Sequence, residues 1–348
     1  MAEAVVNPLD LDTAFHESFP AVVASPGGTT GILAEVVRPV VDKHGMVAGF
    51  SAGGIDCRTD VRGCPEIGRS KALRITVLRM RDAAAAERAA AEAEAADFAV
   101  NPDNARVEIP KYPEAHSHWR PTVPTLGVIV AHGDYLVALF IIHPSTDLAA
   151  MTTLATQVLD RQLPRLDSFT PTPVDALTEL PLDTDGMLRR LLPDPPGQWM
   201  YPTTTRVERG ETAGFGGMHE ANGVVWGPGG ADHLLRMNAR DRSKPDPAGI
   251  DRIATNGYNS VLRAADAPSA RRYFETEPQD RTEVGRSITA PTGVPDAQCF
   301  RLDHPSGAIS YFQCHVLDGR YVAAVVDPDE ATVRQMAAAQ YALLVRNR

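Results

Sequence analysis

The sequence contains one short motif whose residue types and spacing are known from enzymes. Gly49-Phe50-Ser51-Ala52-Gly53 fits the G-x-S-x-G pattern of the nucleophile elbow, in which a strand leads into the serine and a helix follows at once. The next residues, 54–59, show no helical period. We therefore favour a Gly/Ser turn. A serine hydrolase stays as an alternative, in which Ser51 would need an imidazole within hydrogen-bond reach, from His132, His143 or His315.

The four cysteines form two local pairs, one in each half of the chain. Cys57 and Cys64 flank a polar, turn-prone loop, whereas Cys299 and Cys314 bracket a turn at residues 304–307 between two strand-like runs. If that turn closes a hairpin, the second pair faces across the ladder at a distance that suits a disulfide. Four reduced thiols are the alternative, and structural zinc fits poorly because neither pair has the usual ligand spacing. Two disulfides imply an oxidising compartment.

Two further groups of residues are weak candidates for a binding site. His116 and His118 would share one face of a strand and could hold a metal, but no carboxylate or third histidine follows closely, and a solvated strand edge is the simpler interpretation. We expect no cofactor. A ligand could lie between the two halves of the chain, although core packing is the more frequent role of large aromatic residues. The aromatic candidates are Trp119, Trp199, Tyr201, Phe215 and Trp226.

The elements that would position these residues occur twice. Residues 77–88 and 261–272 share a Val-Leu-Arg run followed by Asp-Ala and a closing Arg, at an offset of about 184. Residues 132–135 and 318–321 repeat a tight-turn signature before an apolar strand, at an offset of about 186. Each unit would be a strand, a helix, a hairpin and a second helix. The sequence thus predicts an α+β fold of two tandem related domains, each a mainly antiparallel sheet with helices on one face, of ferredoxin-like type.

A proline-rich stretch separates the two repeats. We expect an N-terminal domain over residues 1–192, with the connector beginning at 164, and a C-terminal domain over 193–348. Asp82 is expected to cap a helix over residues 83–98, Ser145 or Thr146 a helix to about residue 163, and Asp327 the last helix.

Composition limits the classes of function. The chain of 348 residues has a formal net charge of -10, which does not suit nucleic-acid binding or an anionic membrane surface. No apolar run reaches the length of a spanning helix, and the first residues lack the features of a signal peptide. Either the protein is cytoplasmic or this chain is a mature form, and the predicted disulfides favour a secreted mature form.

Several runs resemble an uncharacterised family of actinobacterial cell-envelope lipoproteins, of mycobacterial and nocardial type. They cover residues 96–104, 118–121, 124–127, 169–173, 227–231 and 258–266. The resemblance implies a signal peptide and a lipid-bearing cysteine upstream of Met1, so that the precursor would be lipid-anchored in the cell envelope. It implies no catalytic residues, because the family has no established function.

Three functions remain. The favoured one is a non-catalytic envelope protein that binds a small or apolar ligand between its two halves. The second is a scaffold or accessory protein that binds another envelope protein, which predicts an exposed apolar patch. The third is the hydrolase that would use Ser51.

Overall fold

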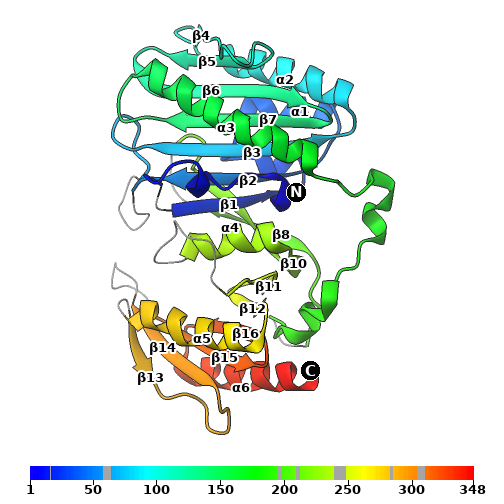
Figure 1. Cartoon of the computed structure of the whole chain (residues 1–348), viewed down its shortest axis with the longest axis vertical. Helices are drawn as coiled ribbons and strands as arrows, with labels where there is room; N and C mark the ends of the chain where they lie inside the picture. The colour runs from blue at the N-terminus through cyan, green and yellow to red at the C-terminus, as the bar shows by residue number, and fades with distance from the viewer. Residues whose placement is uncertain are drawn as a thin grey trace. The chain divides into compact units, whose positions relative to one another are not determined.

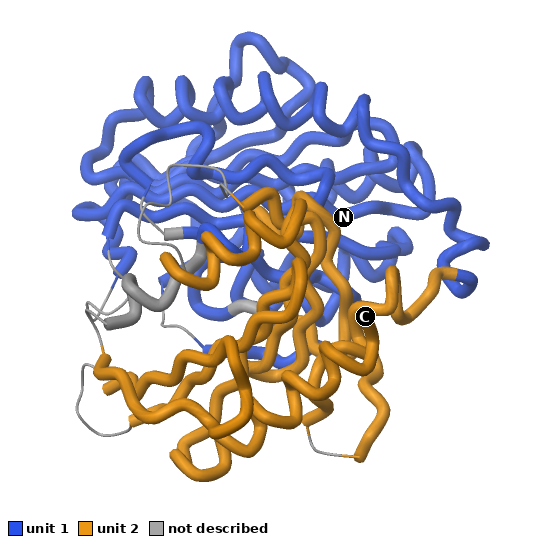
Figure 2. Tube along the Cα trace, turned by 60° about the horizontal axis from the view of Figure 1, so that its bottom comes forward, with its two compact units in different colours: residues 1–179, 204–220, 233–244 blue, residues 180–203, 221–232, 245–348 orange. Residues whose placement is uncertain are grey.

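The structure is a computed structural model of the whole chain, and it describes residues 1–15, 17–57, 64–194, 197–208, 212–238, 248–282, 285–303 and 310–348. The chain forms two compact units, shown in blue and orange in Figure 2. Unit 1 comprises residues 1–179, 204–220 and 233–244, and unit 2 comprises 180–203, 221–232 and 245–348. Each unit is therefore discontinuous, whereas the sequence analysis gave each domain one continuous range.

Unit 1 contains a seven-stranded antiparallel sheet (Figure 1) with the strand order β1-β2-β3-β7-β6-β5-β4. Its strands are β1 (Glu17–Val23), β2 (Met46–Ile55), β3 (Ala72–Met80), β4 (Ala105–Arg106), β5 (His116–Arg120), β6 (Val123–His132) and β7 (Tyr135–Ile142). Its helices are α1 (Arg38–Lys43), α2 (Ala83–Phe98) and α3 (Leu148–Ser168), with short 3-10 helices η1 (Ala2–Ala4), η2 (Pro8–Asp10), η3 (Pro26–Thr29), η4 (Glu35–Val37) and η5 (Val174–Glu179).

Unit 2 contains a second seven-stranded antiparallel sheet, with the strand order β10-β11-β12-β16-β15-β14-β13. Its strands are β10 (Val224–Trp226), β11 (Arg252–Asn256), β12 (Asn259–Arg263), β13 (Gly285–Ile288), β14 (Ala297–Asp303), β15 (Ser310–Asp318) and β16 (Tyr321–Asp327). Its helices are α5 (Ala267–Thr282), α6 (Glu330–Arg346), η6 (Thr184–Gly186) and η7 (Leu188–Arg190). A separate two-stranded sheet pairs β8 (Thr203–Glu208) with β9 (Gly217–Asn222), and the residues of α4 (Pro228–Asn238) are divided between the units.

The two sheets repeat each other strand for strand and in register. Arg79 pairs with Tyr135 across β3 and β7, and Arg263 pairs with Tyr321 across β12 and β16. The predicted tandem α+β fold is confirmed. Each sheet is larger than the predicted unit, because two strands precede the repeated strand and two short strands extend the far edge.

The helices of unit 1 pack on both faces of its sheet. The alanines of α2 approach closely enough to share a core with Leu78, Leu136 and Ala138. Figure 1 shows α3 in front of this sheet and α2 behind it, which extends the one-face arrangement expected from the sequence. The reason is that β7 is buried at nearly every position, so both of its faces need cover.

Two buried glutamines attach the chain that precedes each sheet to the last helix of each unit. In unit 1 the Gln162 side chain accepts from the Val6 amide at 3.0 Å and donates to the Ala4 carbonyl at 2.7 Å. In unit 2 the Gln340 side chain accepts from the Leu192 amide at 2.8 Å and donates to the carbonyl of residue 190 at 2.6 Å. The repeat therefore begins near residue 186 of unit 2, and this correspondence was missed in the sequence.

Replacing Gln340 by leucine should lower the free energy of unfolding by about 2 kcal/mol, because a buried amide N–H and a carbonyl lose their partners. Urea unfolding followed by circular dichroism measures the change. Gln335→Leu on the exposed face of the same helix is the matched control. Equal stabilities of the two variants would contradict the role assigned to Gln340.

Helix boundaries agree with the sequence only in part. Asp82 caps α2 as predicted, through a bond from the Ala85 amide. The caps of α3 and α6 are Asp147 and Asp329, two residues or fewer beyond the predicted positions. α3 also continues through Pro164 to Ser168, so the connector begins later than predicted. None of the described helices is long and apolar enough to cross a membrane.

Arg263, the repeated arginine of unit 2, forms a bidentate ion pair. Arg263 donates two hydrogen bonds of 2.8 Å to the carboxylate of Asp251, and these bonds lower the pKa of Asp251 below its usual value. A carboxyl whose pKa is lower in the folded state stabilises the fold above its unfolded pKa and loses that contribution as the pH falls through the folded value.

Asp251→Asn should therefore cost about 1 kcal/mol at pH 7, since the carboxylate is partly exposed and screened. The difference in stability between this variant and wild type should decrease as the pH falls below about 4. Thermal melts across this pH range measure it, with Asp103→Asn, an exposed carboxylate, as the control. A difference that does not change with pH would contradict the assignment.

Candidate functional site

The G-x-S-x-G motif lies inside strand β2, and the turn expected around it is wrong. Its three fixed residues face one side of the sheet and pair in register with β3: Gly49 with Leu78, Ser51 with Thr76, and Gly53 with Arg74. A methyl group added at Gly49 would lie 2.5 Å from the Leu78 side chain. The small residues thus make room for large neighbours on the next strand, and their spacing of two is the period of a strand.

Ser51 is buried and bonded within this sheet. Its hydroxyl lies 2.9 Å from the Thr76 hydroxyl and accepts a hydrogen bond of 3.2 Å from Nη1 of Arg74. The three histidines considered as its base are engaged elsewhere: His132 with Asp167, His143 with Ser145, and His315 with Phe300. The hydrogen bonds of Ser51 are therefore structural, and this geometry does not favour a hydrolase.

Arg74 is the most unusual side chain of unit 1. It is 2% exposed, and no carboxylate among the described residues pairs with it. Its Nε atom is buried without a hydrogen-bond partner. Burial lowers the pKa of Arg74 to about 9, which corresponds to a penalty on the order of 5 kcal/mol for keeping the charge. A buried cation without a counter-ion is expensive, and such groups are frequent at functional sites.

Apolar side chains surround this cation. The guanidinium lies 4.6 Å from the centre of the Phe215 ring, which meets the Phe19 ring edge-on at 6.2 Å. Phe140 is the cross-strand neighbour of Arg74 and is only half-buried. We call Arg74 with Phe19, Phe140 and Phe215 the arginine–phenylalanine cluster.

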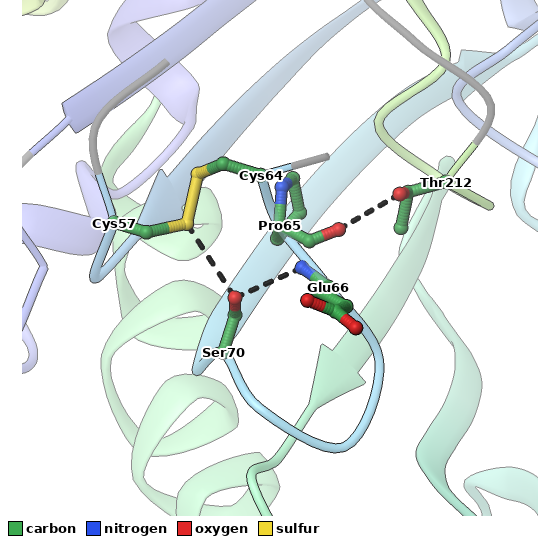
Figure 3. Close-up of a disulfide and its surroundings, with 6 residues drawn as sticks. All are labelled: Cys57, Cys64, Pro65, Glu66, Ser70 and Thr212. Atoms are coloured by element: carbon green, nitrogen blue, oxygen red, sulfur yellow. Dashed lines mark hydrogen bonds between the residues drawn. A yellow bond between two sulfur atoms is a disulfide. The ribbon is translucent and has the colours of Figure 1, made fainter. Parts of the chain in front are cut away.

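A glycine-rich segment brings Phe215 to the cluster from far along the chain. Gly214 has a positive φ of 72°, and a methyl group there would lie 2.6 Å from the Phe140 ring. Thr212, at the start of this segment, donates a hydrogen bond of 2.7 Å to the Pro65 carbonyl (Figure 3). Pro65 follows the Cys57–Cys64 disulfide, whose Cys57 sulfur lies 3.5 Å from the Ser70 hydroxyl. Pro65, next to the disulfide, therefore anchors the segment that carries Phe215.

Both cysteine pairs are joined in the structure. The second bridge connects Cys299 and Cys314, which are directly paired across β14 and β15 as the hairpin predicts. The turn at residues 304–307 that suggested this pairing lies outside the described residues. The two disulfides indicate an oxidising compartment, as expected of an extracellular or secreted protein.

The aromatic candidates are divided between the two units. Phe215 belongs to the arginine–phenylalanine cluster, whereas Trp119 lies on the short strand β5 of the same unit. In unit 2, Trp226 donates a hydrogen bond of 3.1 Å to Thr255, and Trp199 and Tyr201 are 56% and 65% exposed.

His116 and His118, the histidine pair, both lie on β5. His118 has Nδ1 3.4 Å from a Glu94 carboxylate oxygen and its ring edge-on to Phe98, while His116 is half-buried. In the part of the chain that the structure describes, no group of three or more His, Cys, Asp or Glu residues is placed to hold a metal ion.

Two family models together match almost the whole chain. The N-terminal model of DUF7373, a domain of unknown function, matches residues 1–182, and the C-terminal model of the same domain matches residues 187–347. The chain belongs to the DUF7373 family. The second match begins where the glutamine contacts place the start of the second repeat. No curated protein matches this DUF7373 chain.

Two solved structures are distantly similar to this DUF7373 protein. The extracellular domain of PknH from Mycobacterium tuberculosis has 10% identity and a TM-score of 0.30, covering 47% of this chain and 94% of that chain. DynU16, a putative protein of the dynemicin biosynthetic locus, has 9% identity and a TM-score of 0.11, covering 95% and 97%. Likenesses at these scores carry no argument about the function of this chain.

Arg74 was not predicted as a site residue, although the sequence contains one signal for it. A single arginine stands within the apolar, strand-forming run Ala72-Leu73-Arg74-Ile75-Thr76-Val77. A charged residue on the buried face of a central strand needs a partner or a function.

Proposed function

We propose that this protein is a non-catalytic, extracellular binding protein for a small, largely apolar ligand, which is held at the arginine–phenylalanine cluster of unit 1. The observation that carries the proposal is the buried guanidinium of Arg74, which has no counter-ion among the described residues and lies next to three phenylalanines. Folding pays a large penalty for this charge, and a ligand that neutralises it would recover part of that penalty.

Two further observations support a binding role. Phe215 covers the cluster from a glycine-rich segment, and such a segment can move with little backbone strain. The half-buried Phe140 gives the cluster one side that is open to solvent. Small-ligand sites commonly combine apolar walls with a few polar groups in this way.

The proposal is tested by analysing what the protein carries. Protein isolated from its natural host should release a small molecule on denaturing extraction, detected by mass spectrometry at close to one equivalent. Phe215→Ser should lose it, because the aromatic cover over the cluster is removed. Trp199→Ser, an exposed aromatic residue of unit 2, is the matched control and should retain it. If no preparation carries a ligand, and neither solvent extracts of the host nor a panel of small apolar compounds and carboxylates raises the melting temperature, the proposal is wrong.

We also propose that the natural precursor is anchored to the outside of the cell membrane by lipid. The two disulfides and the resemblance to envelope lipoproteins support this proposal. Detergent phase partitioning of the protein produced from its full native gene in the natural host provides the test. Recovery in the aqueous phase, without lipid in its mass spectrum, would contradict it.

A second candidate function is a scaffold that binds another envelope protein. It is favoured by three exposed aromatic side chains of unit 2, since Trp199, Tyr201 and Tyr258 are 56%, 65% and 78% exposed. The backbone of Tyr201 contacts Gly223. The neighbouring Asn222 side chain accepts a hydrogen bond from the amide of Gly257, the residue before Tyr258. Tyr201 and Tyr258 therefore lie near the same turn. Exposed Trp and Tyr are typical of interaction surfaces.

Crosslinking in intact cells distinguishes this candidate. Replacing Trp199, Tyr201 and Tyr258 together by serine should abolish a specific crosslinked partner, and Phe215→Ser should leave it unchanged. If no crosslink depends on these aromatic residues, the scaffold candidate is wrong.

A further inference from the structure

The hydrogen-bond pattern of Arg74 leaves one edge of its guanidinium free. Nη1 donates to Ser51 at 3.2 Å, and Ser51 in turn lies 2.9 Å from the Thr76 hydroxyl. Nε has no partner, and Nη2 makes no hydrogen bond to a described residue. The free edge therefore carries the Nε and Nη2 donors, the pair that binds a carboxylate through two parallel hydrogen bonds.

A glycine on the neighbouring strand allows Phe215 and the guanidinium to pack closely at this edge. A methyl group added at Gly53 would lie 3.2 Å from Nη2 and 3.1 Å from the Phe215 ring. Gly53 pairs directly with Arg74 across β2 and β3, so any larger residue at this position would press on this edge. The Phe215 ring lies over the guanidinium and would have to shift for an anion to reach it.

The single charge of Arg74 suits a ligand with one negative charge. Arg74 contacts the Phe215 ring, and the other buried side chains packed there are apolar: Phe19, Ile55, Ala72 and Ile142. A dianion such as phosphate would keep an uncompensated charge in an apolar environment, which is strongly unfavourable. A carboxylate with an apolar body matches both the single cation and the aromatic walls.

We propose that the ligand of this site is a monocarboxylate with an apolar body, whose carboxylate binds the Nε–Nη2 edge of Arg74 while the Phe215 ring shifts and packs on the apolar body. This inference rests on the proposed function and names its ligand class. Ser51 is then a positioning residue, because its bond to Nη1 turns the free edge toward the ligand.

Octanoate, octanol and inorganic phosphate are suitable probes, measured by isothermal titration calorimetry and by the shift of the melting temperature of the full chain. Octanoate should bind at least tenfold more tightly than octanol, and phosphate should not bind. Arg74→Met should lose at least tenfold in octanoate affinity and keep its affinity for octanol. Arg74→Lys, which keeps the charge but loses the paired donors, should be intermediate.

Gly53→Ala provides a second variant that keeps the guanidinium. It should weaken octanoate binding severalfold, because the added methyl group lies against Nη2. Equal affinities for octanoate and octanol, or unchanged octanoate binding by Arg74→Met, would overturn the carboxylate assignment and leave the binding function intact. Tight phosphate binding would also overturn it. If no probe binds and the isolated protein carries no small molecule, both the ligand class and the proposed function are wrong.

Discussion

Removing the Cys299–Cys314 disulfide should lower the free energy of unfolding by about 3 kcal/mol. The bridge closes a loop with a sequence separation of 15, and constraining the unfolded chain over such a loop is worth about this amount. Both cysteines are also part of the buried core that faces α6 in unit 2, so alanines leave a small packing defect there.

The double variant Cys299→Ala with Cys314→Ala should be compared with wild type by urea unfolding under oxidising conditions. The matched control is Cys57→Ala with Cys64→Ala, whose sequence separation is only 7 and whose expected loss is smaller. A loss below about 1 kcal/mol in the first variant would contradict the prediction. Reducing agent should destabilise wild type and leave a variant that lacks both disulfides unchanged.

Replacing Arg74 by methionine should leave the ligand-free protein at least as stable as wild type, with an expected gain of about 1–3 kcal/mol. A buried cation without a counter-ion is costly, and hydrophobic residues of similar volume often stabilise such positions. The lost contact with the Phe215 ring offsets part of this gain. Such a gain would support the proposed binding role of Arg74.

Urea unfolding of ligand-stripped protein measures this effect. Arg88→Met, an exposed arginine on α2 of the same unit, should stay within about 0.5 kcal/mol of wild type. If Arg74→Met lowers the free energy of unfolding by more than about 1 kcal/mol, the guanidinium stabilises the sheet and its burial no longer argues for a ligand.

The sequence predicted the duplication because repeated patterns are local. The Val-Leu-Arg run before an aspartate cap, and the tight turn before an apolar strand, each depend on neighbouring residues and recur at nearly constant offsets. Hairpin geometry is also local, which is why the pairing of Cys299 with Cys314 followed from the spacing alone. Among the outer strands, β14 was expected as part of the cysteine hairpin, whereas most of the others were missed because they are short or carry a weak apolar pattern.

The candidate site could not be predicted in this way. The G-x-S-x-G motif was interpreted as a turn, although its spacing of two also matches a strand with small residues on one face. The pairing of β2 with β3 shows that the motif is a strand, and its register places Gly53 and Ser51 beside Arg74. Register depends on which strands pair, and that is settled by packing over the whole sheet.

The sequence by itself therefore determined the tandem α+β architecture and the local disulfide of unit 2, since each follows from residues close along the chain. Only the tertiary structure showed that Arg74 is buried with no counter-ion in the described part of the chain, and that Phe215, about 140 residues later, covers it. The physical reason is that burial and charge pairing are properties of side chains that meet in space. No pattern within either segment reveals the other.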